Sequence, residues 1–357
     1  MNPSYTIQNL SRPKFLADHD QLPVMVSGIA GVSGYNAFHW LRERYGDKVI
    51  GQRPRRNWNL NGDNVVGHDL SEVDAIRSVI QQRNVRTVIN CGGSCALKAC
   101  ECDPEMAQQL NVTNVSHLLD VIEDTDIRLV HLSIDLVYSG AGQGGHVETD
   151  PTDPVTVYGK TMVEAEQLVM DRRPNSCILR ISLPMGISFN GHAGAIDWIQ
   201  HRFAKNRPAT LYFDEVRTPT YVECLNEVIE EVAVSDMSGI YHCGGPRNLS
   251  LYEIAQIVNR VGGYDPELLI GCPRIEAGPM PPRAGNVTMD SSKLAAALGR
   301  DPFAPWPLCE TMVPTDRKWH YDRSSGSEPL TNGSLEWIER VLYLRQTRLP
   351  EQRRFAP

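Results

Sequence analysis

The feature that most restricts the fold is a glycine-rich loop that directly follows a short apolar segment. Residues 23–27 are Pro-Val-Met-Val-Ser, and the chain then reads Gly28-Ile-Ala-Gly31-Val-Ser-Gly34 before a helix-like stretch. A buried parallel strand that turns into a helix through such a loop is typical of dinucleotide-binding units. The first glycine permits a tight turn, the second lets the backbone approach a pyrophosphate, and the third allows close helix–strand contact. The alternative is a turn that merely contains spare glycines.

Strand-like and helix-like segments alternate through the first half of the chain. Apolar runs suited to buried strands lie at 23–28, 48–51, 87–90, 128–133 and 177–180. Helix-like stretches lie between them, at 35–41, 75–82, 104–122 and 161–171. Because strands that alternate with helices form right-handed crossovers, the sequence predicts an α/β fold with a Rossmann-type, doubly wound parallel sheet.

The composition changes after Ile181, where glycine and proline become frequent and strand-like and helix-like segments no longer alternate regularly. This change predicts a smaller C-terminal lobe of loops and short helices, and Ser334 is a candidate cap for a final amphipathic helix. The predicted division is an N-terminal arm at 1–22, a Rossmann domain at 23–181, a substrate-binding lobe at 182–330 with some segments that return to the Rossmann domain, and a C-terminal helix and tail at 331–357.

Composition and charge exclude several functional classes. The 357 residues carry a net charge of -8 with no dominant basic face, which argues against nucleic acid as a partner. No apolar run approaches the roughly 20 residues of a membrane helix, and the N-terminus lacks the apolar core of a signal peptide. The nine cysteines include no CxxC pair, so we expect reduced thiols, a cytoplasmic protein and no metal site.

The end of the second predicted strand indicates which cofactor the loop would hold. An acidic residue there would bind the ribose of NAD, but the chain has Arg53, Arg55 and Arg56. Arginines can grip a 2′-phosphate, so we predict NADP(H); a solvated basic loop is the alternative. Asp69 is a candidate to accept a hydrogen bond from the adenine amino group. Further candidate cofactor-binding residues are Gly28, Ala30, Gly31, Val32, Gly34, Leu70, Cys91, Gly92, Gly93, Tyr158 and Pro184.

Several longer motifs occur in the same order as in one enzyme family: GIAGVSG, VINCGG, DPE followed by LNV, LSIDLVYSG, VYGKT, RTPTYV and PPRAGNVTMDSSKL. On these motifs, over about residues 23–300, the chain resembles the extended short-chain dehydrogenase/reductases. The resemblance is to the dTDP-4-dehydrorhamnose reductase-like branch, which also contains the regulatory beta subunit of methionine adenosyltransferase. It implies a ligand between the Rossmann lobe and the C-terminal lobe, and a homodimer formed through a helix like the one at 161–171.

The catalytic positions of that family are only partly retained. The resemblance implies a Ser or Thr, a Tyr, and a Lys four residues after the Tyr. Tyr158 matches the tyrosine, which in a reduction donates a proton to the carbonyl oxygen. The lysine position is Met162 and the Ser/Thr position is Ile134. Asp135 matches a carboxylate usual in the branch and is a candidate to orient a substrate or a water.

Neighbouring side chains are not expected to replace the lost groups. Ser133 adjoins Ile134, but adjacent strand residues face opposite sides. Lys160 lies two residues after Tyr158, which is about 200° around a helix and directs it away. Without a nearby lysine, Tyr158 should titrate near its ordinary pKa of about 10. We therefore predict an altered and slow active site.

Two arginines are candidates for substrate binding. The resemblance implies that Arg217 and Arg283 lie near the diphosphate of a nucleotide sugar, where the guanidinium fork matches phosphate oxygens. The alternative is a salt bridge between domains, to Asp214 or Glu148.

Two functions stay open. The first is an NADP(H)-dependent oxidoreductase or epimerase that acts slowly on a nucleotide sugar or related keto substrate, and the retained Tyr158 and two arginines favour it. The second is a non-catalytic NADP-binding protein that regulates or scaffolds a protein partner, and Ile134 and Met162 favour it.

Overall fold

The chain folds around a seven-stranded sheet in which every neighbouring pair of strands is parallel. A computed structural model describes residues 20–191, 194–278, 281–323 and 333–344. The predicted N-terminal arm and the tail after the last helix fall almost entirely outside these residues. The spatial order of the strands is β11 (Gly239–Cys243), β6 (Cys177–Ile181), β5 (Arg128–Ile134), β4 (Thr87–Asn90), β1 (Val24–Ser27), β2 (Val49–Arg53) and β3 (Val65–Gly67). The predicted doubly wound sheet is confirmed.

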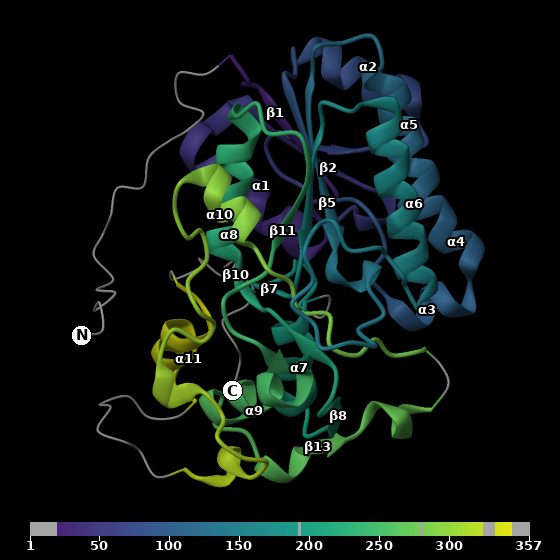
Figure 1. Cartoon of the computed structure of the whole chain (residues 1–357). Helices are drawn as coiled ribbons and strands as arrows, with labels where there is room; N and C mark the ends of the chain where they lie inside the picture. The colour runs from purple at the N-terminus through teal and green to yellow at the C-terminus, as the bar shows by residue number, and fades with distance from the viewer. Residues whose placement is uncertain (1–19, 192–193, 279–280, 324–332, 345–357) are drawn as a thin grey trace.

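Helices cover both faces of this sheet (Figure 1). One face carries α1 (Val32–Tyr45) and α8 (Val222–Val234), and the other carries α2 (Val73–Gln82), α5 (Asn114–Ile122) and α6 (Val157–Arg172). The reason is the period of a strand, whose successive side chains point to opposite faces. Val24 and Val26 of β1 belong to the apolar cluster of the first face, whereas Met25 belongs to that of the second.

The segment predicted as one helix at 104–122 is helical throughout, but a π-helical turn lies inside it. After α3 (Leu97–Cys102), the side chain of Asp103 caps α4 (Pro104–Gln108), and a π-helical turn at Gln109–Thr113 precedes α5. Within that turn Asn111 accepts a hydrogen bond from the Ser94 amide at 2.7 Å and donates one to Thr161 Oγ1 at 2.9 Å. A π turn often marks a functional or strained position, and this one directs a buried amide toward the start of α6.

The region predicted as a C-terminal lobe includes the elements after β6 that lie outside the central sheet, and this division of the chain stays a prediction. Its helices are α7 (Ala195–Ala204), α9 (Leu251–Val261) and α11 (Leu335–Leu342), whereas α10 (Ser292–Leu298) packs against β11 of the central sheet. Three two-stranded sheets join β7 (Pro184–Met185) to β10 (Thr220–Tyr221), β9 (Val216–Arg217) to β12 (Leu249–Ser250), and β8 (Ala209–Tyr212) to β13 (Leu269–Cys272). No helix in the described part of the chain is long and apolar enough to span a membrane.

The last described segments, 303–323 and 333–344, contribute buried side chains to the core of the molecule. Ser334 caps α11 by accepting a hydrogen bond from the Trp337 amide, as predicted. Trp306, Trp319 and Trp337 are buried, as expected for core residues. Tyr221 of β10 donates to the Val341 carbonyl at 3.2 Å. The last helix is thus tied by a hydrogen bond to a strand that pairs with β7.

Candidate functional site

The glycine loop between β1 and α1 has the geometry expected of a phosphate cradle. Gly28 has a φ of 73°, and a Cβ there would lie 2.6 Å from Gly92 Cα. A Cβ on Gly34 would lie 2.4 Å from the Gly28 carbonyl oxygen. Gly31 is the N-cap of α1 and supplies no side-chain cap, so the N–H groups that begin the helix keep capacity for an anion. The residues present therefore fit a dinucleotide pyrophosphate.

The buried side-chain amides of Gln52 and Asn90 connect the ends of β2 and β4 to the loops beside them. Gln52 at the end of β2 accepts from the Gly28 amide at 3.1 Å and donates to the His68 carbonyl at 2.6 Å. Asn90 at the end of β4 accepts from the Gly92 amide at 3.1 Å. Gln52 was missed as a site residue from the sequence, although a polar residue at the end of an apolar strand was a visible signal.

The three arginines at the end of β2 and just after it differ in what they contact. Arg53 donates to backbone carbonyls of its own loop. Arg55 forms an ion pair with Glu72, and its backbone amide donates to Asp69 at 3.2 Å. Arg56 is exposed and makes no hydrogen bond or ion pair within the described residues. The arginines lie together at the sheet edge where an NADP ribose was predicted, but two of them already have partners.

The other predicted cofactor residues gather at the same edge of the sheet. Ala30 and Val32 flank the N-cap of α1, and Leu70 and Cys91 follow β3 and β4. Burial raises the pKa of the Cys91 thiol to about 12, so it is protonated at neutral pH. Gly93 has a φ of 141°, and Pro184 begins β7 just after β6. The cofactor assignment of these residues stays a prediction.

Tyr158 lies in the first turn of α6, which Thr156 caps by accepting from the Gly159 amide at 2.9 Å. Met162 is buried one turn later in the same apolar cluster, and Ile134 packs against that cluster. Burial raises the pKa of Tyr158 well above its ordinary value, further than the sequence alone suggested. Its hydroxyl makes no hydrogen bond to any residue that the structure describes. Tyr158 is therefore a protonated phenol in a mainly apolar cluster, with the charges of Asp135 and Arg217 close enough to influence its pKa.

The neighbouring polar residues do not replace the lost groups. Ser133 donates to Glu166 on the other side of its strand, as the alternation predicts. Glu166 in turn pairs with Arg180 at 2.7 Å, and Arg180 donates to the Tyr138 hydroxyl at 2.7 Å. Lys160 is exposed. Ser133 is thus committed to a buried network.

Arg217 joins the end of β5 to the C-terminal lobe through a buried ion pair. Its guanidinium donates to Asp135 at 2.6 Å and to Glu215 at 2.7 Å, and it is only 3% exposed. Asp135 also accepts from the Ser182 hydroxyl at 2.8 Å. Arg283 lies 3.8 Å from Glu215. The two arginines and two carboxylates form a cluster of zero net charge, which we call the Arg217 cluster.

The salt-bridge partners named from the sequence were wrong. Asp214 pairs with Arg274 at 3.5 Å, and Glu148 accepts from the His242 amide at 2.8 Å. The partners of Arg217 are instead Asp135, in the turn that follows β5, and Glu215, which directly precedes β9. Arg283 is less buried than Arg217, since its side chain is 23% exposed. Its guanidinium stacks 4.7 Å above the Tyr212 ring.

Comparison with known proteins shows which family the chain belongs to. A family model described as "RmlD substrate binding domain" matches residues 41–307. The chain belongs to this family. It is 25% identical to the probable low-salt glycan biosynthesis reductase Agl14 of Haloferax volcanii, over 77% of this chain and 91% of that protein. It is 26% identical to the methionine adenosyltransferase 2 subunit beta of Xenopus laevis, over 70% of this chain and 77% of that protein.

Solved structures share the fold of this RmlD-family chain. The dTDP-4-dehydrorhamnose reductase of Bacillus anthracis, solved in complex with NADP, superposes with a TM-score of 0.64 at 18% identity. The alignment covers 79% of this chain and 95% of that chain. At this identity the likeness shows the fold alone.

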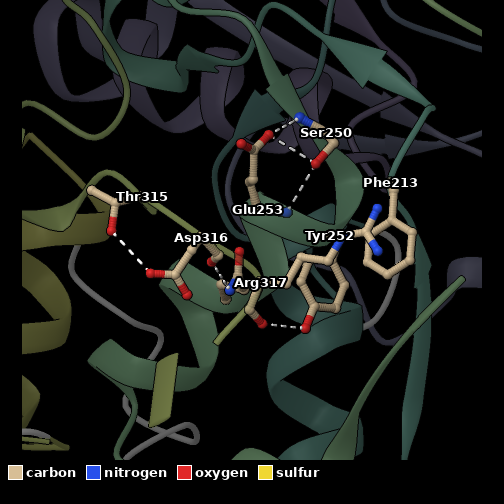
Figure 2. A pocket seen from close by; sticks show the side chains of 8 residues that line it. Phe213, Ser250, Tyr252, Glu253, Thr315, Asp316 and Arg317 are labelled. Carbon is tan, nitrogen blue, oxygen red and sulfur yellow. Dashed lines mark hydrogen bonds between the residues drawn. The ribbon is translucent and has the colours of Figure 1, made fainter. Parts of the chain in front are cut away.

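The described residues after the RmlD match help to form a pocket of about 210 Å³ (Figure 2). Arg317 lies 3.9 Å above the Phe213 ring, and its carbonyl accepts from the Tyr252 hydroxyl at 2.9 Å. Ser250 and Glu253 form the capping box of α9 at its rim. The lining is Phe213, Ser250, Tyr252, Glu253, Gln256, Thr315, Asp316 and Arg317, which includes none of the predicted site residues.

Proposed function

We propose that this RmlD-family chain binds NADP(H) and reduces a nucleotide sugar or a related keto substrate slowly. The glycine cradle, the arginines after β2 and the likeness to reductases support the binding and the reaction class. The observation that carries the altered activity is the setting of Tyr158, which lies in an apolar cluster with Met162 and Ile134. The homodimer, the cytoplasmic location and the identity of the sugar stay predictions.

Different residues would bind the cofactor and donate the proton in the proposed reduction. Gly28, Gly31 and the start of α1 would hold the pyrophosphate, and Arg55 and Arg56 would face the 2′-phosphate. Bound NADPH supplies a hydride. Tyr158 holds the proton that the carbonyl oxygen needs. Because burial raises the pKa of Tyr158, it can donate that proton but does not become a tyrosinate base near neutral pH, which favours reduction over oxidation.

The lost groups limit the rate. A hydroxyl at position 134 would polarise the carbonyl, and loss of one such donor costs about 100- to 1,000-fold in rate. A lysine at position 162 would lower the pKa of Tyr158 by its charge. With neither group near Tyr158, we expect turnover far below that of an efficient reductase.

A non-catalytic regulatory role is the second candidate, and the Arg217 cluster favours it. Arg217 is buried and donates to Asp135 and Glu215, so it would have to leave two carboxylates to reach a diphosphate. Such a role would keep the cofactor cradle and would not need the catalytic groups.

Calorimetric titration tests the cofactor assignment. We expect NADP(H) to bind at least tenfold more tightly than NAD(H), because a 2′-phosphate gains charged hydrogen bonds from arginine. Equal affinities would contradict the assignment. If neither dinucleotide binds, the proposed function is wrong altogether.

Restoring the family's groups should restore the rate. We expect Ile134→Thr combined with Met162→Lys to raise NADPH oxidation with a dTDP-4-keto sugar by at least about 100-fold. Each single change should do much less, because such groups act as a unit. Adding Tyr158→Phe should remove the gain. A wild-type rate that is already high and survives Tyr158→Phe would show that other residues carry the chemistry.

A further inference from the structure

Arg53, the last residue of β2, uses its guanidinium to hold the loop that follows the strand. Arg53 donates to the carbonyls of Leu60, Pro54 and Arg55, and Trp58 lies within reach at 3.5 Å. A Cβ on Gly67 would lie 2.7 Å from Arg53 Nη1, so the guanidinium packs directly on the end of β3. These contacts close the loop around Arg53, and they leave Arg55 and Arg56 as the arginines that can turn to a ligand.

Arg55 is held by one carboxylate through two hydrogen bonds. Arg55 Nε donates to Glu72 Oε2 at 2.8 Å, and Arg55 Nη2 donates to Glu72 Oε1. Glu72 Oε2 also accepts from the Asp69 amide at 2.8 Å, and His68 Nδ1 lies 3.6 Å away. The hydrogen bond from Arg55 holds the pKa of Glu72 at about 2. Glu72 therefore stays charged at every pH at which the protein would work.

The pair is exposed enough to be exchanged. The side chain of Arg55 is 60% exposed and that of Glu72 is 30% exposed. Solvent-exposed ion pairs contribute less than about fivefold to an equilibrium constant. A phosphate presents the same forked acceptor as a carboxylate and carries more charge, so it can replace Glu72 on Arg55 at little cost.

We infer that Glu72 is a specificity-determining residue that competes with the cofactor's 2′-phosphate for Arg55. In the free protein Arg55 lies on Glu72, and on binding of NADP(H) its guanidinium turns to the phosphate. The Glu72 carboxylate thereby lowers the affinity for NADP(H) and leaves the affinity for NAD(H) unchanged. The ratio of the two affinities, which the arginines raise, is therefore smaller than it would be without Glu72. This inference rests on the proposed binding of NADP(H).

The experiment compares the affinities of NADP⁺ and NAD⁺ for wild type and for Glu72→Gln by calorimetry. Glutamine keeps an oxygen that can accept from the Asp69 amide but lacks the charge that holds Arg55. We expect NADP⁺ to bind about three- to fivefold more tightly to Glu72→Gln and NAD⁺ to change by less than about twofold. Adding Arg55→Gln to Glu72→Gln should abolish the gain.

Asp74→Asn is the matched control. It removes the same charge two residues away, from a carboxylate that pairs with Arg77 at 2.8 Å and is 97% exposed. An equal gain in Asp74→Asn would show a general effect of charge and would overturn the inference. So would an unchanged or weaker NADP⁺ affinity in Glu72→Gln, or an equal gain for NAD⁺.

Arg55→Gln alone gives a second test that does not depend on Glu72→Gln folding. It should weaken NADP⁺ binding by about tenfold and leave NAD⁺ binding unchanged. No effect on NADP⁺ would show that Arg55 stays on Glu72, and the inference would fall while the proposed function stood. Wild type that binds no dinucleotide would instead refute the proposed function.

Discussion

Arg217→Ala is expected to lower the free energy of unfolding by about 3–5 kcal/mol. Removing this guanidinium leaves Asp135 and Glu215 buried without their shared counter-charge, and breaking a buried ion pair from one side has a cost of that size. Arg283 compensates little, because it lies 3.8 Å from Glu215 and makes no ion pair with Asp135 within the described residues. Urea unfolding followed by circular dichroism measures the loss.

Two further variants test whether the loss of stability comes from breaking a buried ion pair or from removing any charge. Arg77→Ala removes a half-buried arginine that pairs with the exposed Asp74, and it should cost less than about 1 kcal/mol. Asp135→Asn keeps Glu215 as a partner for Arg217, so it should cost less than Arg217→Ala. If Arg217→Ala and Arg77→Ala destabilise the protein equally, the Arg217 cluster does not have the role described above.

Gly34→Ala is expected to abolish dinucleotide binding and to destabilise the fold. Its Cβ would lie 2.4 Å from the Gly28 oxygen, 2.8 Å from the Gly28 carbonyl carbon and 3.1 Å from Ile29 Cα. These are backbone atoms, so no side chain can rotate away. Overpacking of this kind costs about 1–3 kcal/mol or more and would move the loop that faces the phosphates. We expect the affinity for NADP(H) to fall by more than about 100-fold, as measured by calorimetry beside thermal unfolding.

Two other glycines, one in the same loop and one far from it, serve as controls. A Cβ on Gly31 would meet only the Gly28 oxygen, at an ordinary 3.7 Å. Gly31→Ala should therefore keep the stability of wild type and lose affinity only, because its methyl group lies where the pyrophosphate would approach. Gly142→Ala, which would meet nothing within 4 Å, should change neither property. Normal cofactor binding by Gly34→Ala would contradict the account of the cradle.

Much of the fold and part of the site could be predicted because they depend on local spacing. The alternation of apolar runs and helices predicted the parallel sheet, and the spacing of Gly28, Gly31 and Gly34 predicted the close approach of β1 and α1. The four-residue step from Tyr158 to Met162 likewise placed both side chains on one face of α6. Each of these inferences needed only neighbours in the sequence.

The remaining features depend on contacts between distant segments. Arg217 and Asp135 are 82 residues apart, and only the folded chain shows that they meet. Two nearer acids, Asp214 and Glu148, were equally plausible by sequence and are engaged elsewhere. The π turn at Gln109–Thr113 also escaped prediction, because its apolar residues keep the general pattern of a helix. Tertiary packing decides such cases.

The burial of the three tryptophans has a consequence for how the protein unfolds. Trp306, Trp319 and Trp337 belong to one apolar cluster that also contains Val24 of β1 and Leu225 of α8. The described residues after the family match contribute Trp319 and Trp337 to this cluster, so we expect them to unfold together with the central sheet and not as a separate unit. Indole fluorescence, to which Trp40 of α1 also contributes, should then change in one transition with the loss of the sheet.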